Sequence, residues 1–167
     1  MGKKLSPSKL EAFFALDRTM NREGLDGDDL DDWFHLCSLI TNNLTGPSDA
    51  HSSERTAFRV PVSCPVDIQI GETAFTGETR NVSVQGVSIC SDEALPVDNR
   101  TVHIDITFSF PRFLRRTERV VMQFSGHVRW SKVGRTSIMN LEFTPLEQAK
   151  FEALESVLHR YIRTQIG

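Results

Sequence analysis

The sequence predicts a mainly β protein, an antiparallel sandwich or barrel with helices before and after it. Apolar and polar residues alternate in the middle of the chain, for example over 66–70 and 102–108, which is the period of a strand with one buried face. Before residue 45 and after residue 145, apolar residues recur at spacings of three and four, as they do in amphipathic helices. The chain of 167 residues is long enough for one main domain and a small appendage.

Residues 1–44 are predicted to form a hairpin of two helices. Ser6-Pro7 supplies an N-cap and a first-turn proline, Gly24 interrupts the pattern, and the acidic residues of 26–29 suit the start of a second helix. The first apolar stripe is Leu10, Phe13 and Phe14, followed after a slip in the period by Leu16 and Met20. The second is Leu30, Trp33, Phe34, Cys37, Ile40 and Leu44. Because short helices are seldom stable alone, we expect packing within the hairpin and onto the main domain. A partner or dimer surface is the alternative.

Residues 45–54, with the sequence TGPSDAHSSE, are predicted to be a linker because they are rich in turn formers. The main domain then covers residues 55–167. Its strand candidates are 66–70, 102–108, 120–130 and 136–143, and the runs are punctuated by Gly71, Gly77, Gly86, Pro96, Pro111 and Gly134. Thr144-Pro145 supplies a cap and a proline, so a C-terminal helix is predicted from Leu146 to about Gln165.

Composition and charge indicate a soluble protein. The hydrophobic share of 39% and the charged share of 25% are ordinary for a globular domain. No stretch approaches the roughly 20 apolar residues of a membrane span, and residues 1–9 do not resemble an export signal, so we expect a cytoplasmic location. The net charge is −3, with five basic and nine acidic groups in residues 1–50. This charge argues against a general nucleic-acid binder, while the nearly neutral remainder can still hold a cationic site for an anion.

No pattern in the sequence indicates an enzyme, a metal site or a resident cofactor. Cys37, Cys64 and Cys90 are odd in number and widely spaced, so we expect buried reduced thiols rather than disulfides or metal ligands. The five histidines are scattered and have no nucleophile motif nearby. The acidic run within 28–32 lacks the EF-hand pattern and is interpreted as a solvated helix start.

Arg55 and Arg59 form the first candidate motif, because they stand four residues apart just before the first strand. In extended backbone this spacing places both side chains on one face, about 13 Å apart. A guanidinium can bind a phosphate through two parallel hydrogen bonds, pair with the edge of a guanine or lie flat against a base. Two arginines can equally be solvated surface charges, so this motif alone is weak.

Asn81, Ser83 and Gly86 form the second motif, in the segment RNVSVQGVSI. An asparagine offers a donor and an acceptor that match a purine edge. Glycine permits positive φ or a close approach of backbone to a ligand. The alternative is a polar turn between two strands, where Asn and Gly are favoured for local reasons.

Together the two motifs, RxxxR followed by NxSxxG, make the chain resemble the PilZ domain family over residues 52–166. The segment GHVRW at 126–130 resembles a late strand of the family, NLEF at 140–143 lies where the family commonly has a glycine, and the terminal helix with HRYIR also fits. The resemblance implies a six-stranded β-barrel with a helix over one end. It also implies a receptor for cyclic di-GMP.

By this resemblance, Arg55 and Arg59 hold phosphates and guanines, Asn81 reads a guanine edge, and Ser83 and Gly86 shape the turn. Two residues depart from the family pattern. Glu54 stands where many members have a further arginine, which favours one bound molecule over a stacked pair, and Asn140 replaces a glycine. Glu54 and Trp130 are further candidates to line the ligand, although a buried core tryptophan is the alternative for Trp130.

The resemblance implies a binding module that signals to a protein partner. Ordering of residues 50–59 on ligand binding would reorient the acidic helical hairpin and expose or hide a partner surface. The alternative is a ligand-independent adaptor, and the oligomeric state and downstream process are open. A basic patch, Arg112, Arg115, Arg116 and Arg119, is interpreted as solvated or as facing an acidic partner, because no recognition helix accompanies it.

Overall fold

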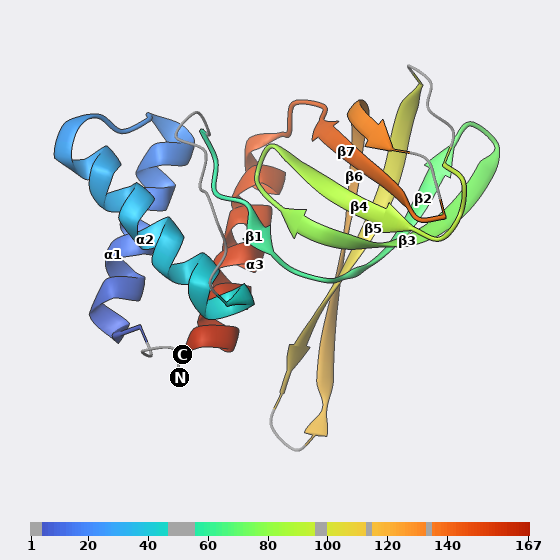
Figure 1. Ribbon diagram of the computed structural model, residues 1–167. Helices are drawn as coiled ribbons and strands as arrows, with labels where there is room; N and C mark the ends of the chain where they lie inside the picture. The colour runs from blue at the N-terminus through green and yellow to red at the C-terminus, as the bar shows by residue number, and fades with distance from the viewer. Residues whose placement is uncertain (1–4, 47–55, 96–99, 113–114, 133–134) are drawn as a thin grey trace. The chain divides into compact units, whose positions relative to one another are not determined.

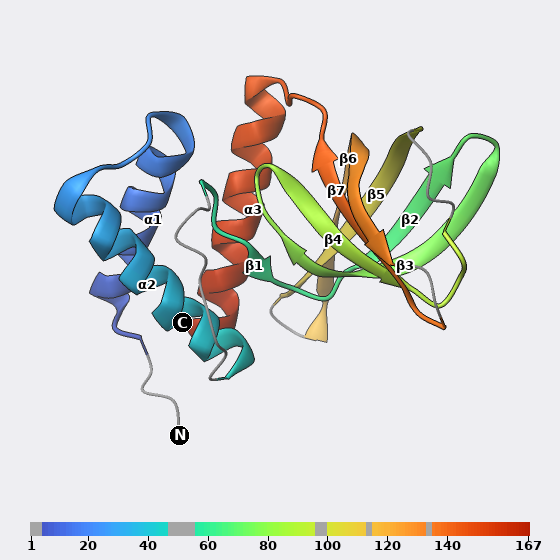
Figure 2. The ribbon, with the colours of Figure 1, turned by 45° about the horizontal axis from the view of Figure 1, so that its top comes forward.

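The computed structural model describes residues 5–46, 56–95, 100–112, 115–132 and 135–167, which fall into two compact units. Met1–Pro61 and Glu155–Gly167 form a helical unit, and Val62–Leu154 form a β-barrel unit (Figures 1 and 2). Within the described ranges, none of the helices combines the length and apolar character that crossing a bilayer requires.

The helical unit contains α1 (Pro7–Arg22), α2 (Gly27–Thr45), the two-residue strand β1 (Val60–Pro61) and most of α3 (Gln148–Ile166). Helix α1 begins as predicted, because the Ser6 hydroxyl accepts a hydrogen bond from the Lys9 N–H and Pro7 occupies the first turn. Gly24, with a φ of 80°, separates the two N-terminal helices. Helices α1 and α2 pack on each other, as expected for a hairpin.

A buried polar network links the three helices. Asp17 Oδ1 accepts a hydrogen bond from Trp33 Nε1 at 3.1 Å, and Asp17 Oδ2 lies 2.7 Å from His159 Nε2. Glu155, also buried, accepts from Asn21 Nδ2 and Arg22 Nη2, both at 2.9 Å. The sequence prediction was wrong about this face of α1. The half-buried Leu16 and Met20 do not complete the buried stripe, whereas Asp17 does.

Aromatic contacts fill the rest of this core. The rings of Phe13 and Phe58 meet edge to face at 5.3 Å, and the ring of Phe14 lies 4.7 Å from that of His159. The guanidinium of Arg163 lies 4.9 Å from the ring centre of Phe14, a distance at which a cation is attracted to the ring face. Phe58, which precedes the barrel in the chain, is therefore part of the helical core.

The barrel unit is a closed antiparallel barrel of six strands, as the sequence resemblance implied. The strands are β2 (Pro65–Ile70), β3 (Thr73–Val82), β4 (Gly86–Ser91), β5 (Thr101–Pro111), β6 (Thr117–Lys132) and β7 (Ser137–Phe143). Within the unit their order is β3-β2-β5-β6-β7-β4, and pairing of β3 with β4 closes the ring. Side chains alternate between the interior and the outer surface. The interior holds Ile68, Ile89, Ile104, Ile106 and Met139.

Two details of the sequence prediction were wrong. Gly77 does not separate strands but lies inside β3, where an added Cβ would come within 2.6 Å of the Cys90 carbonyl oxygen. Helix α3 begins at Gln148 rather than Leu146. Thr144 follows the end of β7 directly, and its N–H donates to the Ser125 carbonyl at 2.8 Å, while a residue before proline favours extended backbone. Pro96 and Gly134 lie outside the described residues.

The three cysteines are free thiols. Cys37 and Cys64 are buried, and Cys90 is half-buried. Burial raises the pKa of the Cys64 thiol to about 11, although a hydrogen bond with Thr79 acts in the opposite direction. Burial, helped by the negative charge of Asp17, also raises the pKa of Cys37. Both thiols are therefore protonated at neutral pH, which makes them poor nucleophiles.

Candidate functional site

The turn between β3 and β4 is held by the Ser83 hydroxyl. Ser83 Oγ accepts hydrogen bonds from the N–H groups of Gln85 and Gly86, both at 3.2 Å. The Ser83 N–H donates to the Gly86 carbonyl at 2.9 Å. The Phe143 N–H donates to the Gln85 carbonyl at 2.9 Å, which ties the turn to the end of β7. Ser83 is buried, and its hydroxyl is used by the backbone of the turn, as serine hydroxyls often are.

Gly86 allows β4 to lie close to β7. A Cβ at this position would lie 2.3 Å from the Leu141 carbonyl oxygen, closer than real Cβ atoms approach. Gly86 is not among the described glycines with positive φ. The sequence suggested two roles for this glycine, a positive φ or a close approach of the backbone to a ligand. The first is wrong. The close approach that the structure shows is between β4 and the neighbouring strand β7.

Asn81 lies next to a β-bulge on the outer surface of the barrel. The register of β3 against β4 shifts between Thr79 and Asn81, so Arg80 is the extra residue, and such bulges re-aim the neighbouring side chains. Asn81 is half-buried, and its side chain makes no hydrogen bond in the part of the chain that the structure describes. Its amide therefore has a donor and an acceptor available for a ligand.

A row of residues crosses four strands from Asn81. In register, Asn81 on β3 opposes Ser88 on β4, Ser88 opposes Asn140 on β7, and Asn140 opposes Trp130 on β6. Asn140, one of the two departures from the family pattern, and Trp130, one of the further ligand-lining candidates, thus share a row with Asn81. The side chain of Trp130 lies outside the described part of the structure. Asn81 and Asn140 are half-buried and Ser88 between them is buried. This row next to the Ser83 turn is the candidate site on the barrel.

Two exposed arginines beside this row were missed by the sequence motifs. Arg80 is the bulge residue next to Asn81, and Arg129 lies at a second register shift, between Val128 and Trp130. Arg129 forms an ion pair with Glu142. The hydrogen bond from Arg129 is the main cause that lowers the pKa of Glu142. Arg80 was visible in the sequence as the residue preceding Asn81, but the bulge that sets its direction was not.

The arginine motif is described only in part. Arg59 is exposed and belongs to the helical unit, three residues before the barrel unit begins at Val62. Its neighbour Phe58 is buried against Phe13. Arg55 and Glu54 lie outside the described residues. The structure therefore brings together Asn81, Ser83 and Gly86, while the position of the arginines at that site stays a prediction.

Among the described residues, no group of three or more histidine, cysteine, aspartate or glutamate side chains is arranged to hold a metal ion. The groups that the barrel offers at the candidate site are instead an amide, a hydroxyl-stabilised turn and guanidinium groups. These are suited to hydrogen bonding with a polar anionic molecule.

The fold defines the class of this protein as a small closed β-barrel domain followed by a helix. The family model described as PilZ domain matches residues 53–163, well over half of the chain, and the chain belongs to the PilZ domain family. No curated protein matches the sequence significantly.

Two solved structures are similar in fold. The PilZ domain of YcgR from Escherichia coli, solved with c-di-GMP, has 12% identity and a TM-score of 0.55 over 66% of this chain and 92% of that one. Inhibitor of motility (MotI/DgrA) from Bacillus subtilis has 18% identity and a TM-score of 0.51 over 65% of this chain. The match covers 50% of the MotI/DgrA chain. At these identities the likeness concerns the fold alone.

Proposed function

We propose that the chain is a receptor that binds cyclic di-GMP through Arg55, Arg59 and residues 81–86. The observation that carries this proposal is the hairpin at Ser83 on a PilZ barrel, beside which the Asn81 amide has no hydrogen-bond partner among the described residues. Further support comes from the PilZ domain of YcgR, which was solved with c-di-GMP.

Each residue has a physical role in this proposal. The ligand carries two negative charges and two guanines, so Arg55 and Arg59 pair with its phosphates and pack on or pair with its guanines. Asn81 hydrogen-bonds a guanine edge. Ser83 and Gly86 hold the turn under Asn81 rather than contribute binding energy themselves. Glu54, an acidic residue beside Arg55, disfavours a second anionic ligand molecule, so we propose one molecule per chain.

We expect Arg59→Ala to weaken cyclic di-GMP binding by at least about tenfold, because charge-assisted hydrogen bonds contribute about 1.5–3 kcal/mol each. Calorimetric titration of the full chain is the measurement, and it also gives the stoichiometry. The wild type should bind at micromolar concentration or tighter. The matched control is Arg18→Ala, an exposed arginine of α1, which should bind as the wild type does.

The absence of both heat and a thermal shift with the wild type would contradict the receptor proposal. The adaptor alternative would then be preferred, in which the same barrel binds a protein partner without the nucleotide. A stoichiometry of two would contradict the role given to Glu54 while leaving the receptor proposal in place.

We further propose that ligand binding is transmitted to the helical unit through the segment that precedes the barrel. Arg59 is adjacent to Phe58, and Phe58 packs against Phe13 of α1. A ligand that fixes Arg59 therefore acts one residue away from the helical core. Fixing backbone costs roughly 1–2 kcal/mol per residue, which the phosphate contacts can offset. Residues 50–55 of the segment expected to become ordered lie outside the described residues.

We expect saturating cyclic di-GMP to slow amide hydrogen exchange within residues 5–58, because ordering of residues 50–59 would restrict both the segment and α1. Exchange measured by mass spectrometry, with and without ligand, tests this step. Arg59→Ala at the same ligand concentration is the control and should show little slowing. Unchanged exchange in a wild-type protein that demonstrably binds the ligand would refute the transmission step alone.

A further inference from the structure

The paired ends of β5 and β6 continue past the barrel as a two-stranded ribbon (Figure 1). Pairing of β5 with β2 stops at Ile106, and pairing of β6 with β7 starts at Gly126. Beyond these points the two strands pair with each other as far as Pro111 and Thr117. Two-stranded ribbons are only marginally stable in water unless they pack against something else. One face of this ribbon meets that need, because Phe108 and Phe110 are at most 1% exposed, whereas the other face points outward.

This outward face has an exposed valine at its centre. Val121 is 57% exposed, and it is the one large hydrophobic side chain in the described ranges that is exposed to this degree. It lies directly opposite Thr107. Side chains of the same parity on the two strands share one face, and the residues two positions away on β6, Arg119 and Gln123, are likewise exposed.

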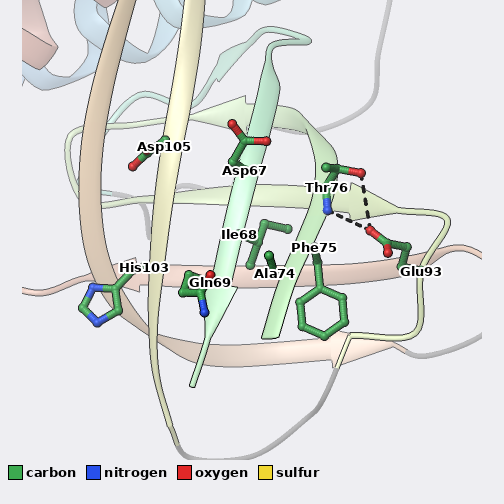
Figure 3. Close-up of a pocket in the computed structure, with 9 residues that line it drawn as sticks. All are labelled: Asp67, Ile68, Gln69, Ala74, Phe75, Thr76, Glu93, His103 and Asp105. Carbon is green, nitrogen blue, oxygen red and sulfur yellow. Dashed lines mark hydrogen bonds between the residues drawn. The ribbon is translucent and has the colours of Figure 1, made fainter. Parts of the chain in front are cut away.

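On one side of Val121 the face is acidic and hollowed. Asp105 lies directly opposite Asp67 on the neighbouring strand β2, and like charges placed in this way are unfavourable. The two aspartates line a surface hollow of about 350 Å³ together with Glu93, whose carboxylate accepts a hydrogen bond from the Thr76 N–H at 2.7 Å (Figure 3). We call this feature the acidic hollow. Its carboxylates would be stabilised by a cation.

On the other side of Val121 the face is basic. Arg119 opposes Ser109, and Asp105 opposes Gln123, so Arg119 and Asp105 lie two residue pairs from Val121 in opposite directions along the ribbon. At the usual rise of about 3.4 Å per residue, each is roughly 7 Å from Val121 along the strands. Within the described residues Arg119 makes no ion pair, whereas the neighbouring Arg112 pairs with Glu118.

We propose that this face is the interface of a two-fold homodimer. A two-fold axis through Val121, lying in the interface and perpendicular to the strands, brings Val121 against the Val121 of a second copy and reverses the strand direction. Each Arg119 then lies opposite Gln123 of the other copy. Asp105, at the edge of the acidic hollow, is one strand further across, about 5 Å away, which a flexible arginine side chain can reach. One surface is thus complementary to itself, as a closed dimer requires. The occupant is a second copy because this chain supplies the cation and the carboxylates on opposite sides of the apolar centre.

This dimer does not depend on cyclic di-GMP, so it is tested with the ligand-free full chain. Sedimentation at increasing concentration should show a monomer–dimer equilibrium that weakens with salt, because the charged contacts are at the surface. The face is narrow and polar, so we expect a dissociation constant in the micromolar range rather than below it. Val121→Ser should weaken the dimer without changing the far-ultraviolet circular dichroism.

Charge reversal gives the sharper test. Asp105→Lys alone and Arg119→Glu alone should each raise the dissociation constant of the dimer by at least about tenfold, because like charges then face each other. An equimolar mixture of the two variants should form a heterodimer close to wild-type strength, since the introduced lysine of one variant would face the introduced glutamate of the other. The matched controls are Asp31→Lys and Arg18→Glu, exposed positions of α2 and α1, which should leave dimerisation unchanged.

Three results would overturn the proposal. The wild type could remain monomeric at concentrations on the order of 1 mM in low salt, well above the expected range. The two charge reversals could leave a dimer intact, which would place its interface elsewhere. The mixture could stay monomeric although both variants are folded by circular dichroism, which would show that Asp105 and Arg119 do not meet.

Discussion

Asp17→Ala is expected to lower the free energy of unfolding by about 3–5 kcal/mol, the range for removing one partner from a buried ion pair or hydrogen-bonded network. Asp17 accepts from Trp33 Nε1 and lies 2.7 Å from His159 Nε2, and all three residues are at most 5% exposed. The alanine would leave two buried polar groups without this partner in the helical unit. Urea denaturation followed by far-ultraviolet circular dichroism measures the loss.

Two further variants separate the network from the charge of Asp17 as such. Asp17→Asn keeps an acceptor for Trp33 and an amide next to His159, so it should cost clearly less than Asp17→Ala. Asp31→Ala changes an exposed carboxylate in α2 and should stay within about 0.5 kcal/mol of the wild type. A cost for Asp17→Ala no larger than that of Asp31→Ala would mean that the network does not stabilise the helical unit.

This network also shows why the helical core could be predicted only in part. The helical period places Asp17 and Asn21 on the same face as Leu10, Phe13 and Phe14. A core that is predicted from apolar residues alone cannot include a buried polar residue such as Asp17. Burial of Asp17 requires donors from α2 and from a helix about 140 residues further along the chain, and a local pattern contains no information about such partners. For the same reason, the sequence did not show that His159 is a partner of Asp17.

The barrel was more predictable because its signal is local. Alternation along 66–70 and 102–108 marks which side chains face the interior, and the turn chemistry of Ser83 and Gly86 acts within a few residues. The register was not predictable. The bulge at Arg80, the close approach of Gly86 to Leu141 and the row from Asn81 to Trp130 all depend on which strands are neighbours. The sequence therefore predicts which residues form the turn between β3 and β4, but not the strand neighbours that set their geometry.

Arg59 lies in the sequence between the helical core and the barrel. Phe58 is buried in the helical unit, Arg59 follows it, and the barrel unit begins at Val62. A ligand-binding arginine would thus lie in the short stretch of chain that joins the two units. Under the receptor proposal, a ligand that fixes Arg59 would therefore restrict the segment of chain that connects the helical unit to the barrel unit. A residue within the barrel, such as Asn81, would contribute affinity without the same influence on the helices.

Gly86→Ala is expected to lower the free energy of unfolding of the barrel by about 3 kcal/mol, at the upper end of the range for overpacking. The added Cβ would lie 2.3 Å from the Leu141 carbonyl oxygen, and the obstacle is backbone rather than the end of a flexible side chain. The strands β4 and β7 would have to separate where Gly86 opposes Glu142. Thermal or urea unfolding gives the stability change, and calorimetry tests the effect on the cyclic di-GMP binding that the receptor proposal assigns to this site.

The matched control is Gly24→Ala, which adds the same methyl group in open space at a φ of 80°. Its cost should be about 1 kcal/mol, from backbone strain alone. The comparison therefore isolates the close approach of β4 to β7. If Gly86→Ala folded as stably as the wild type yet lost the ligand, the glycine would be required by the ligand and not by the neighbouring strand, and the structural role assigned to it here would be wrong.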